Sequence, residues 1–101
     1  MSMELRKYRW SKDYESAEEE LQRLFVTRNI DPIRWEAESG EDIESKTAEE
    51  DTRLWCAEGS FMITVASKQF SMQPGDTLDI PKGSEYNAKA GIAGCVVYQQ
   101  G

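Results

Sequence analysis

Histidine is absent from this chain of 101 residues. Without it the protein has no imidazole for acid–base catalysis, for Ser–His or Cys–His nucleophile pairs, or for metal binding. Cysteine is scarce: Cys56 and Cys95 are the two thiols, and neither belongs to a C-x-x-C pair of the kind that holds zinc. We expect both thiols to be reduced, and Cys56 to be a small buried side chain and not a nucleophile.

Long apolar runs are missing as well. No run approaches the roughly 18 apolar residues of a membrane-spanning helix. Residues 1–10 also lack the apolar stretch of a secretory signal. We therefore expect a cytoplasmic protein that has no membrane partner.

A surplus of positive charge is missing too, because the net charge is −7. Residues 36–51 hold eight acids and one base, so this segment alone carries the whole imbalance. Phosphate binding needs a basic face, and we therefore expect no nucleic-acid partner. The simplest interpretation of the segment is a solvated acidic loop.

The first third of the chain predicts a strand and a helix. Residues 4–10 read as a short strand, and Ser11 or Asp13 then begins a helix that ends before Pro32, because the residue preceding proline avoids helical geometry. An apolar stripe at helical spacing predicts a face that docks on the rest of the fold or on a second copy. The stripe consists of Tyr14, Ala17, Leu21, Leu24 and Phe25.

The remaining residues predict short strands separated by glycine and proline turns, as in an all-β sandwich or barrel. One strand spans 52–57, a turn at Gly59 leads into the next strand at 61–66, and the last strand spans 94–99. Alternation places Trp55 on the face opposite Cys56. We expect Trp55, together with Trp10 and Trp35, to be a packing or dimer contact, and the protein to be a homodimer that covers it.

The turn residues resemble those of the cupin family, whose members are small jelly-roll barrels. The family motifs are G-x5-H-x-H-x3-4-E-x6-G and G-x5-P-x-G-x2-H-x3-N. The matching turn positions in this chain are Gly40, Gly59, Gly75, Pro81 and Gly83.

The resemblance implies an all-β, cupin-type jelly-roll β-barrel at 33–101 with one N-terminal α-helix. Residues 1–32, the N-terminal strand and amphipathic helix, would pack on that barrel within one structural domain. It also implies that Cys56 and Cys95 are neighbours, because the strand that enters the first-motif hairpin lies beside the last strand of a jelly roll.

All four metal-ligand positions of the family are replaced in this register. Lys46 and Ala48 stand at the first two histidines, Thr52 at the glutamate and Tyr86 at the third histidine. A charged lysine repels a metal, alanine offers no ligand, and neutral hydroxyls are poor ligands. Of the nearby acids, Glu44 and Glu50 have the parity to approach the rim. The resemblance therefore implies a degenerate, metal-free cupin without a cofactor or catalytic residue, although enzymatic activity stays open.

Three functions are compatible with this interpretation. In the first, Lys46 anchors a small anionic molecule, and Thr52 and Tyr86 orient it. In the second, the protein is a homodimeric structural or interaction protein, the barrel is filled by Tyr86, and Lys46 extends into solvent. The third, a metal-dependent isomerase, dioxygenase or decarboxylase, is disfavoured by the absence of histidine. An open cavity that contains Lys46 would favour the first, and a filled barrel the second.

We predict that the protein contains no stoichiometric transition metal. The reason is the ligand set, which has no imidazole and offers an ammonium, a methyl group and two hydroxyls. Elemental analysis of protein purified without chelator measures the metal content per chain. Near one equivalent of iron, manganese, nickel or zinc bound inside the barrel would contradict the prediction.

Overall fold

The computed structural model describes residues 3–10 and 17–101 of the chain. The predicted helix start at Ser11 or Asp13 and the apolar Tyr14 lie outside the described residues. The described residues form one helix and seven strands, so the predicted all-β class with a single helix is confirmed. The elements are β1 (Arg6–Arg9), α1 (Ala17–Arg28), β2 (Ile33–Ala37), β3 (Asp42–Thr47), β4 (Thr52–Val65), β5 (Lys68–Met72), β6 (Asp76–Ile80) and β7 (Glu85–Gln100).

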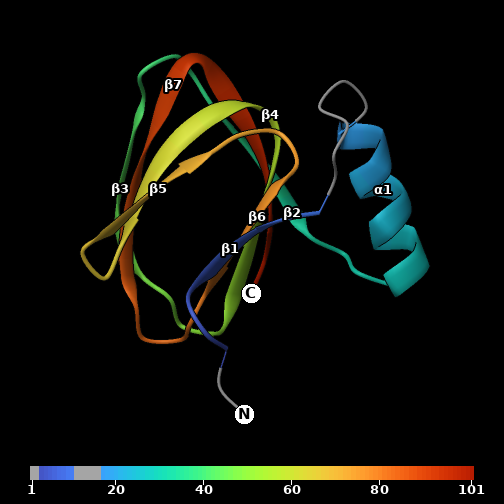
Figure 1. Cartoon of the computed structure of the whole chain (residues 1–101), viewed down its shortest axis with the longest axis horizontal. Helices are drawn as coiled ribbons and strands as arrows, with labels where there is room; N and C mark the ends of the chain where they lie inside the picture. Colours follow the sequence, from blue (N-terminus) through green and yellow to red (C-terminus); the bar gives the residue numbers. More distant parts are fainter. Residues whose placement is uncertain (1–2, 11–16) are drawn as a thin grey trace.

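The two longest strands, β4 and β7, organise the barrel (Figure 1). They pair antiparallel with each other along most of their length. At one end, β6 and then β1 extend the sheet on the β4 side, and β2 extends it on the β7 side. At the other end, β5 pairs with β4 and β3 pairs with β7. Both long strands therefore pass through the two faces of the barrel, as they do in a jelly roll.

A bend at Gly59 allows β4 to serve both faces. The register with β7 shifts on each side of this residue, which has a positive φ of 70°. A Cβ atom at Gly59 would lie 2.0 Å from the carbonyl oxygen of Gly94 on β7. The predicted turn at Gly59 is wrong. Where the register shifts, one strand has more residues than its partner, and this bulge bends β4 without reversing it. The predicted strands at 52–57 and 61–66 are one strand.

The same bulges switch the face that each long strand presents to the core. Along β4 the inward side chains change from even positions, Leu54 and Cys56, to odd positions, which begin at Phe61. Along β7 they change from Ala88 and its even neighbours to Cys95 and its odd neighbours. The predicted last strand, 94–99, is therefore the final part of a longer strand that begins at Glu85. Simple alternation cannot predict this change, because a bulge adds a residue to one strand only.

The two thiols are neighbours, as predicted. Cys56 on β4 pairs with Val97 on β7, and Cys95 lies two positions away on that strand. Both are buried and unbonded. Burial raises the pKa of the Cys56 thiol, and the nearby Cys95 raises this pKa further.

Helix α1 covers the outer side of β4 and β7. Leu21 and Phe25 form a second buried cluster with four residues of these strands, Trp55, Ala57, Val96 and Tyr98. The rings of Phe25 and Trp55 meet edge to face, with centroids 4.9 Å apart. Of the two docking partners that the helical stripe allowed, the helix uses the chain's own sheet.

Trp55 does lie on the face opposite Cys56, but its expected exposure is wrong. The side chain is only 2% exposed, because α1 packs over it. It therefore offers no surface to a second copy. The homodimer stays a prediction, now without the contact that motivated it.

Two nearly buried carboxylates, Asp76 and Asp79, attach β1 to the edge of the sheet. Arg9 contacts Asp76 at 3.0 Å, and Tyr8 donates a hydrogen bond to Asp79 at 3.3 Å. Arg53 on β4 contacts the same Asp79 at 2.6 Å.

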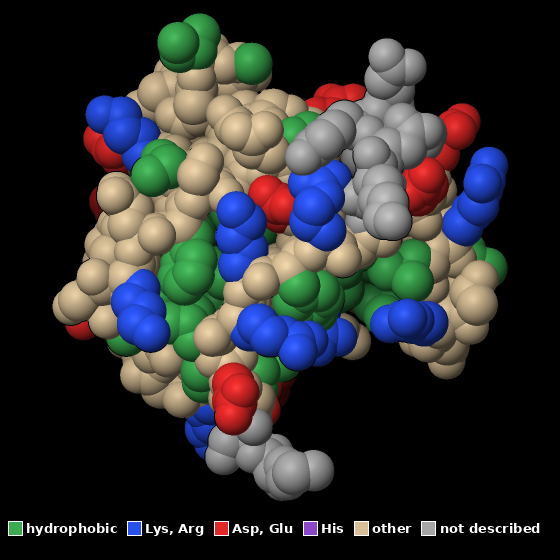
Figure 2. Space-filling view, in the orientation of Figure 1, with side chains coloured by type: hydrophobic (Ala, Val, Ile, Leu, Met, Phe, Trp, Pro, Cys, Tyr) green, Lys and Arg blue, Asp and Glu red, His purple; other side chains and the backbone are tan. Residues whose placement is uncertain are grey.

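Figure 2 shows several lysine and arginine side chains on one side of the molecule, so the acidic surplus of the sequence is not spread evenly over the surface.

Within the described ranges, no helix is long and apolar enough to cross a membrane.

We predict that Gly59→Ala destabilises the protein far more than Gly40→Ala. Both glycines have a φ of 70°, but a Cβ at Gly40 meets nothing within 4 Å. Gly40→Ala therefore lowers the free energy of unfolding only by the strain of a left-handed backbone conformation, about 1 kcal/mol. Gly59→Ala adds a clash with backbone, for a loss of about 3 kcal/mol or more in the free energy of unfolding. Urea unfolding measures both variants, and equal losses would contradict the bend described for β4.

Candidate functional site

Lys46 lies on the inner face of the barrel. It pairs directly with Tyr86 on β7, and Ile43 pairs with Ala88. Residues directly opposite each other in an antiparallel pair project on the same face, and Tyr86 and Ala88 are both buried in the core. A bulge in β3 between Ile43 and Lys46 keeps both residues on this face although they are three positions apart.

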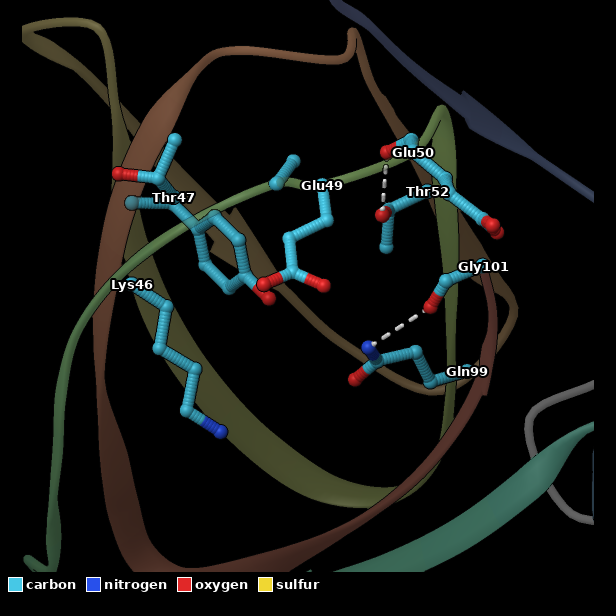
Figure 3. Close-up of a pocket in the computed structure, with 9 residues that line it drawn as sticks. Lys46, Thr47, Glu49, Glu50, Thr52, Gln99 and Gly101 are labelled. Atoms are coloured by element: carbon cyan, nitrogen blue, oxygen red, sulfur yellow. Dashed lines mark hydrogen bonds between the residues drawn. The ribbon is translucent and has the colours of Figure 1, made fainter.

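The four predicted site residues line one opening at the end of the barrel. Its volume is about 530 Å³, and Figure 3 shows the side chains that line it. The lining consists of Lys46, Thr47, Ala48, Glu49, Glu50, Thr52, Tyr86, Gln99 and Gly101. The opening contains Lys46, and this favours the first of the three functions, the binding of an anionic molecule.

Three of the residues that line the opening with Lys46 are neutral, namely Ala48, Thr52 and Tyr86, whereas Glu49 and Glu50 are acidic. Ala48 and Thr52 are buried, and the Thr52 hydroxyl donates a hydrogen bond of 2.9 Å to the Glu50 carbonyl. Burial raises the pKa of the Tyr86 hydroxyl, whereas a hydrogen bond with Gln99 lowers it. The net shift is upward, so Tyr86 is a neutral phenol at physiological pH, able to donate a hydrogen bond.

Lys46 has no anionic partner in the described part of the chain. No described carboxylate lies within 4.0 Å of its ammonium. The sequence left two options, neutralisation by Glu44 or Glu50 and an inward position. Neither acid pairs with it, and Figure 3 shows the side chain extending into the opening. An unpaired ammonium at the mouth of an opening attracts anionic groups from solution.

Sequence reasoning missed a second opening beside the first. Its volume is about 540 Å³, and it shares Lys46, Tyr86 and Gln99 with the first opening. Its other lining residues are Ile33, Trp35, Glu36, Ala37, Glu41, Asp42, Ile43 and Glu44. Glu44 thus lies near Lys46 as expected, but in this second opening.

Trp35 forms an apolar wall of the second opening. Its indole nitrogen donates a hydrogen bond of 3.1 Å to the side-chain oxygen of Gln99. The alternation of Ile33, Trp35 and Ala37 along β2 was the signal for a common face. From the sequence we expected Trp35 to be a packing or dimer contact, because periodicity does not show whether such a face meets the core or a cavity.

The donor set at this end of the barrel does not fit a divalent metal ion. Lys46 carries a positive charge, and the side chains of Ala48, Thr52 and Tyr86 offer no charged ligand. The adjacent Asp51 is used elsewhere, since its carboxylate accepts a hydrogen bond of 2.9 Å from the Lys82 amide. Over residues 3–10 and 17–101, no three histidine, cysteine or acidic side chains gather closely enough to hold a metal.

Comparison with solved structures shows a cupin fold. A DUF861 family protein from Thermotoga maritima matches with a TM-score of 0.67 and 17% identity over 96% of this chain and 98% of that one. The cupin domain of Cnp3 from Schizosaccharomyces pombe matches with a TM-score of 0.62 and 20% identity over 65% of this chain. The Drosophila melanogaster CENP-C structure, bound to CAL1, matches with a TM-score of 0.59 and 17% identity over 67% of this chain.

The last two matches cover 47% and 56% of those proteins, so this chain spans about half their length. No protein-family model matches the sequence, and no curated protein matches it either. The predicted cupin-type jelly roll is therefore confirmed as a fold. The replacement of the family's metal ligands at Lys46, Ala48, Thr52 and Tyr86 stays a prediction.

We predict that both cysteines react slowly in the folded protein. Neither lines either opening, and burial raises the pKa of both thiols. Because the thiolate is the reactive form and burial restricts access of the reagent to the sulfur, alkylation at about pH 8 should be about tenfold slower than in urea. Mass spectrometry of iodoacetamide-treated protein measures the rate at each cysteine. Rapid native labelling of Cys56 would contradict its placement in the core.

Proposed function

We propose that the protein is a metal-free cupin that binds a small molecule through an anionic group at Lys46, without metal or redox chemistry. The observation that carries the proposal is an opening of about 530 Å³ whose inward lysine has no carboxylate of residues 3–10 or 17–101 within 4.0 Å. Small-molecule sites occupy about 300–1,000 Å³ and usually combine apolar walls with a few polar groups.

The neighbouring residues suit a carboxylate. The Lys46 ammonium supplies one charge, and Tyr86, which lies opposite Lys46 in the register of β3 and β7, supplies a neutral hydroxyl donor. A carboxylate has two oxygens and can accept from both groups. Because Lys46 is exposed to solvent, the ion pair gives modest affinity, and the remaining free energy must come from contacts with the walls.

A role in association is the second candidate, and one comparison favours it. The Drosophila CENP-C structure is bound to CAL1, so in that protein a similar fold accompanies a protein partner. In this chain the apolar outer face around Trp55 is covered by α1, and the barrel end is open. The covered outer face and the open barrel end favour the binding of a small ligand over the binding of a protein partner. A metal-dependent enzyme is disfavoured by the donor set described above.

We predict that Lys46→Gln weakens the binding of small carboxylates and that Lys82→Gln does not. Lys82 is a matched control, because it is exposed and lines neither opening. An ion pair with an exposed ammonium contributes up to about 1 kcal/mol, which is about fivefold in affinity. Titration of ¹⁵N-labelled protein with succinate and 3-phenylpropionate, followed by amide shifts of residues 46–52 and 86, measures the change.

Two results of this titration would contradict the proposal. One is a set of spectra that neither carboxylate changes at millimolar concentration. The other is equal affinity in the wild type and Lys46→Gln, which would place the bound carboxylate away from the lysine.

A further inference from the structure

The two openings meet at Lys46 and together form one site with an unusual charge balance. Among the described residues that line them, Lys46 is the single base. The acids in the two linings are Glu36, Glu41, Asp42, Glu44, Glu49 and Glu50. A purely anionic ligand would gain from the lysine but would be repelled by the surrounding carboxylates.

Some of these acids already have partners. Glu36 pairs with Arg34 at 2.8 Å, and Glu41 accepts a hydrogen bond from the Glu38 amide at 3.0 Å. The others, Asp42, Glu44, Glu49 and Glu50, have no described base within 4.0 Å of their carboxylates. Figure 3 shows Glu49 and Lys46 both extending into the same opening from the segment that includes β3. Lys46 and Glu49 thus bring a cation and an anion, neither paired with a described residue of opposite charge, to the same space.

The second opening adds an apolar wall. The Trp35 indole is half-buried, and its ring lies 6.4 Å from that of Phe61 in the core. Its hydrogen bond to Gln99 fixes the orientation of the indole. Ile43 lies on the same inner face and packs against the core cluster. A flat or branched hydrocarbon group placed here would lose contact with water on the side that faces the indole.

From this arrangement we propose that the ligand is a small amino carboxylate with an apolar side group. Its carboxylate binds Lys46, its ammonium binds Glu49, and its apolar group lies against Trp35 and Ile43. The inference rests on the proposed function, because it uses the same Lys46 anchor. It adds the positive charge and the hydrocarbon group, neither of which a plain anion site requires.

The test compares four probes that separate the three contacts. L-phenylalanine carries a carboxylate, an ammonium and an apolar group, whereas 3-phenylpropionate lacks the ammonium, phenethylamine lacks the carboxylate and glycine lacks the apolar group. We expect L-phenylalanine to bind about fivefold more tightly than 3-phenylpropionate or phenethylamine, which each lack one charged contact, and at least about tenfold more tightly than glycine, which lacks the phenyl group. Calorimetry and ¹⁵N amide shifts measure the affinities on the full chain.

Single variants then assign each contact to a residue. Glu49→Gln should weaken the binding of L-phenylalanine about fivefold and leave that of 3-phenylpropionate unchanged, whereas Lys46→Gln should weaken both. Ile43→Ala should weaken L-phenylalanine and leave glycine unchanged. Glu19→Gln is the matched control for Glu49, because Glu19 is exposed on α1 and lines neither opening. Unfolding curves of all variants verify that each is folded.

The possible failures are distinguishable. If 3-phenylpropionate binds as tightly as L-phenylalanine and depends on Lys46, the amino carboxylate is overturned and the proposed function stands. If phenethylamine binds as tightly as L-phenylalanine and Lys46→Gln has no effect, both are overturned. If glycine equals L-phenylalanine, the apolar part of the inference is overturned. If no probe binds and succinate does not bind either, the proposed function itself is overturned.

Discussion

The close approach of Gly59 to the carbonyl of Gly94 is the contact on which the rest of the structure depends. At this point both long strands bend, and a side chain on Gly59 would overlap the backbone of β7. The bend lets β4 and β7 belong to both faces of the barrel and switches which side chains face the core. Without it, β4 could not direct both Cys56 and Phe61 inward, because simple alternation would turn one of them outward.

The candidate site follows from the same bend. Before its bend β7 pairs with β3, and after its bend it pairs with β2. This fork brings Tyr86 opposite Lys46 and places Trp35, on β2, beside the same opening. Residues far apart in the sequence thus line one space because one strand holds two partners in succession. The acids of the site belong to the acidic segment 36–51. The simplest interpretation of that segment from the sequence alone was a solvated loop.

The sequence predicted the fold through its turns, and the site only in part. Pro81 and Gly83 have strong local preferences, so the turn there could be read from residue type. Gly59 carries the same preference but forms a bulge, since a positive φ is common to turns and bulges. The burial of Trp55 depends on where a distant helix packs, which no local pattern contains. Glu49 and Trp35 were missed because their importance comes from facing the same space as Lys46.

The charged residues of β1 also bear on how two copies of the barrel can meet. β1 is the last strand on its side of the sheet, and it carries Arg6, Lys7 and Arg9 along a short segment. Asp76 neutralises part of this charge from within, through contacts with Lys7 and Arg9. A second copy that added its own β1 to this edge would still bring like charges together along the strand. Continuous strand addition between copies is therefore unfavourable at this edge, and the barrel is protected there from open-ended polymerisation.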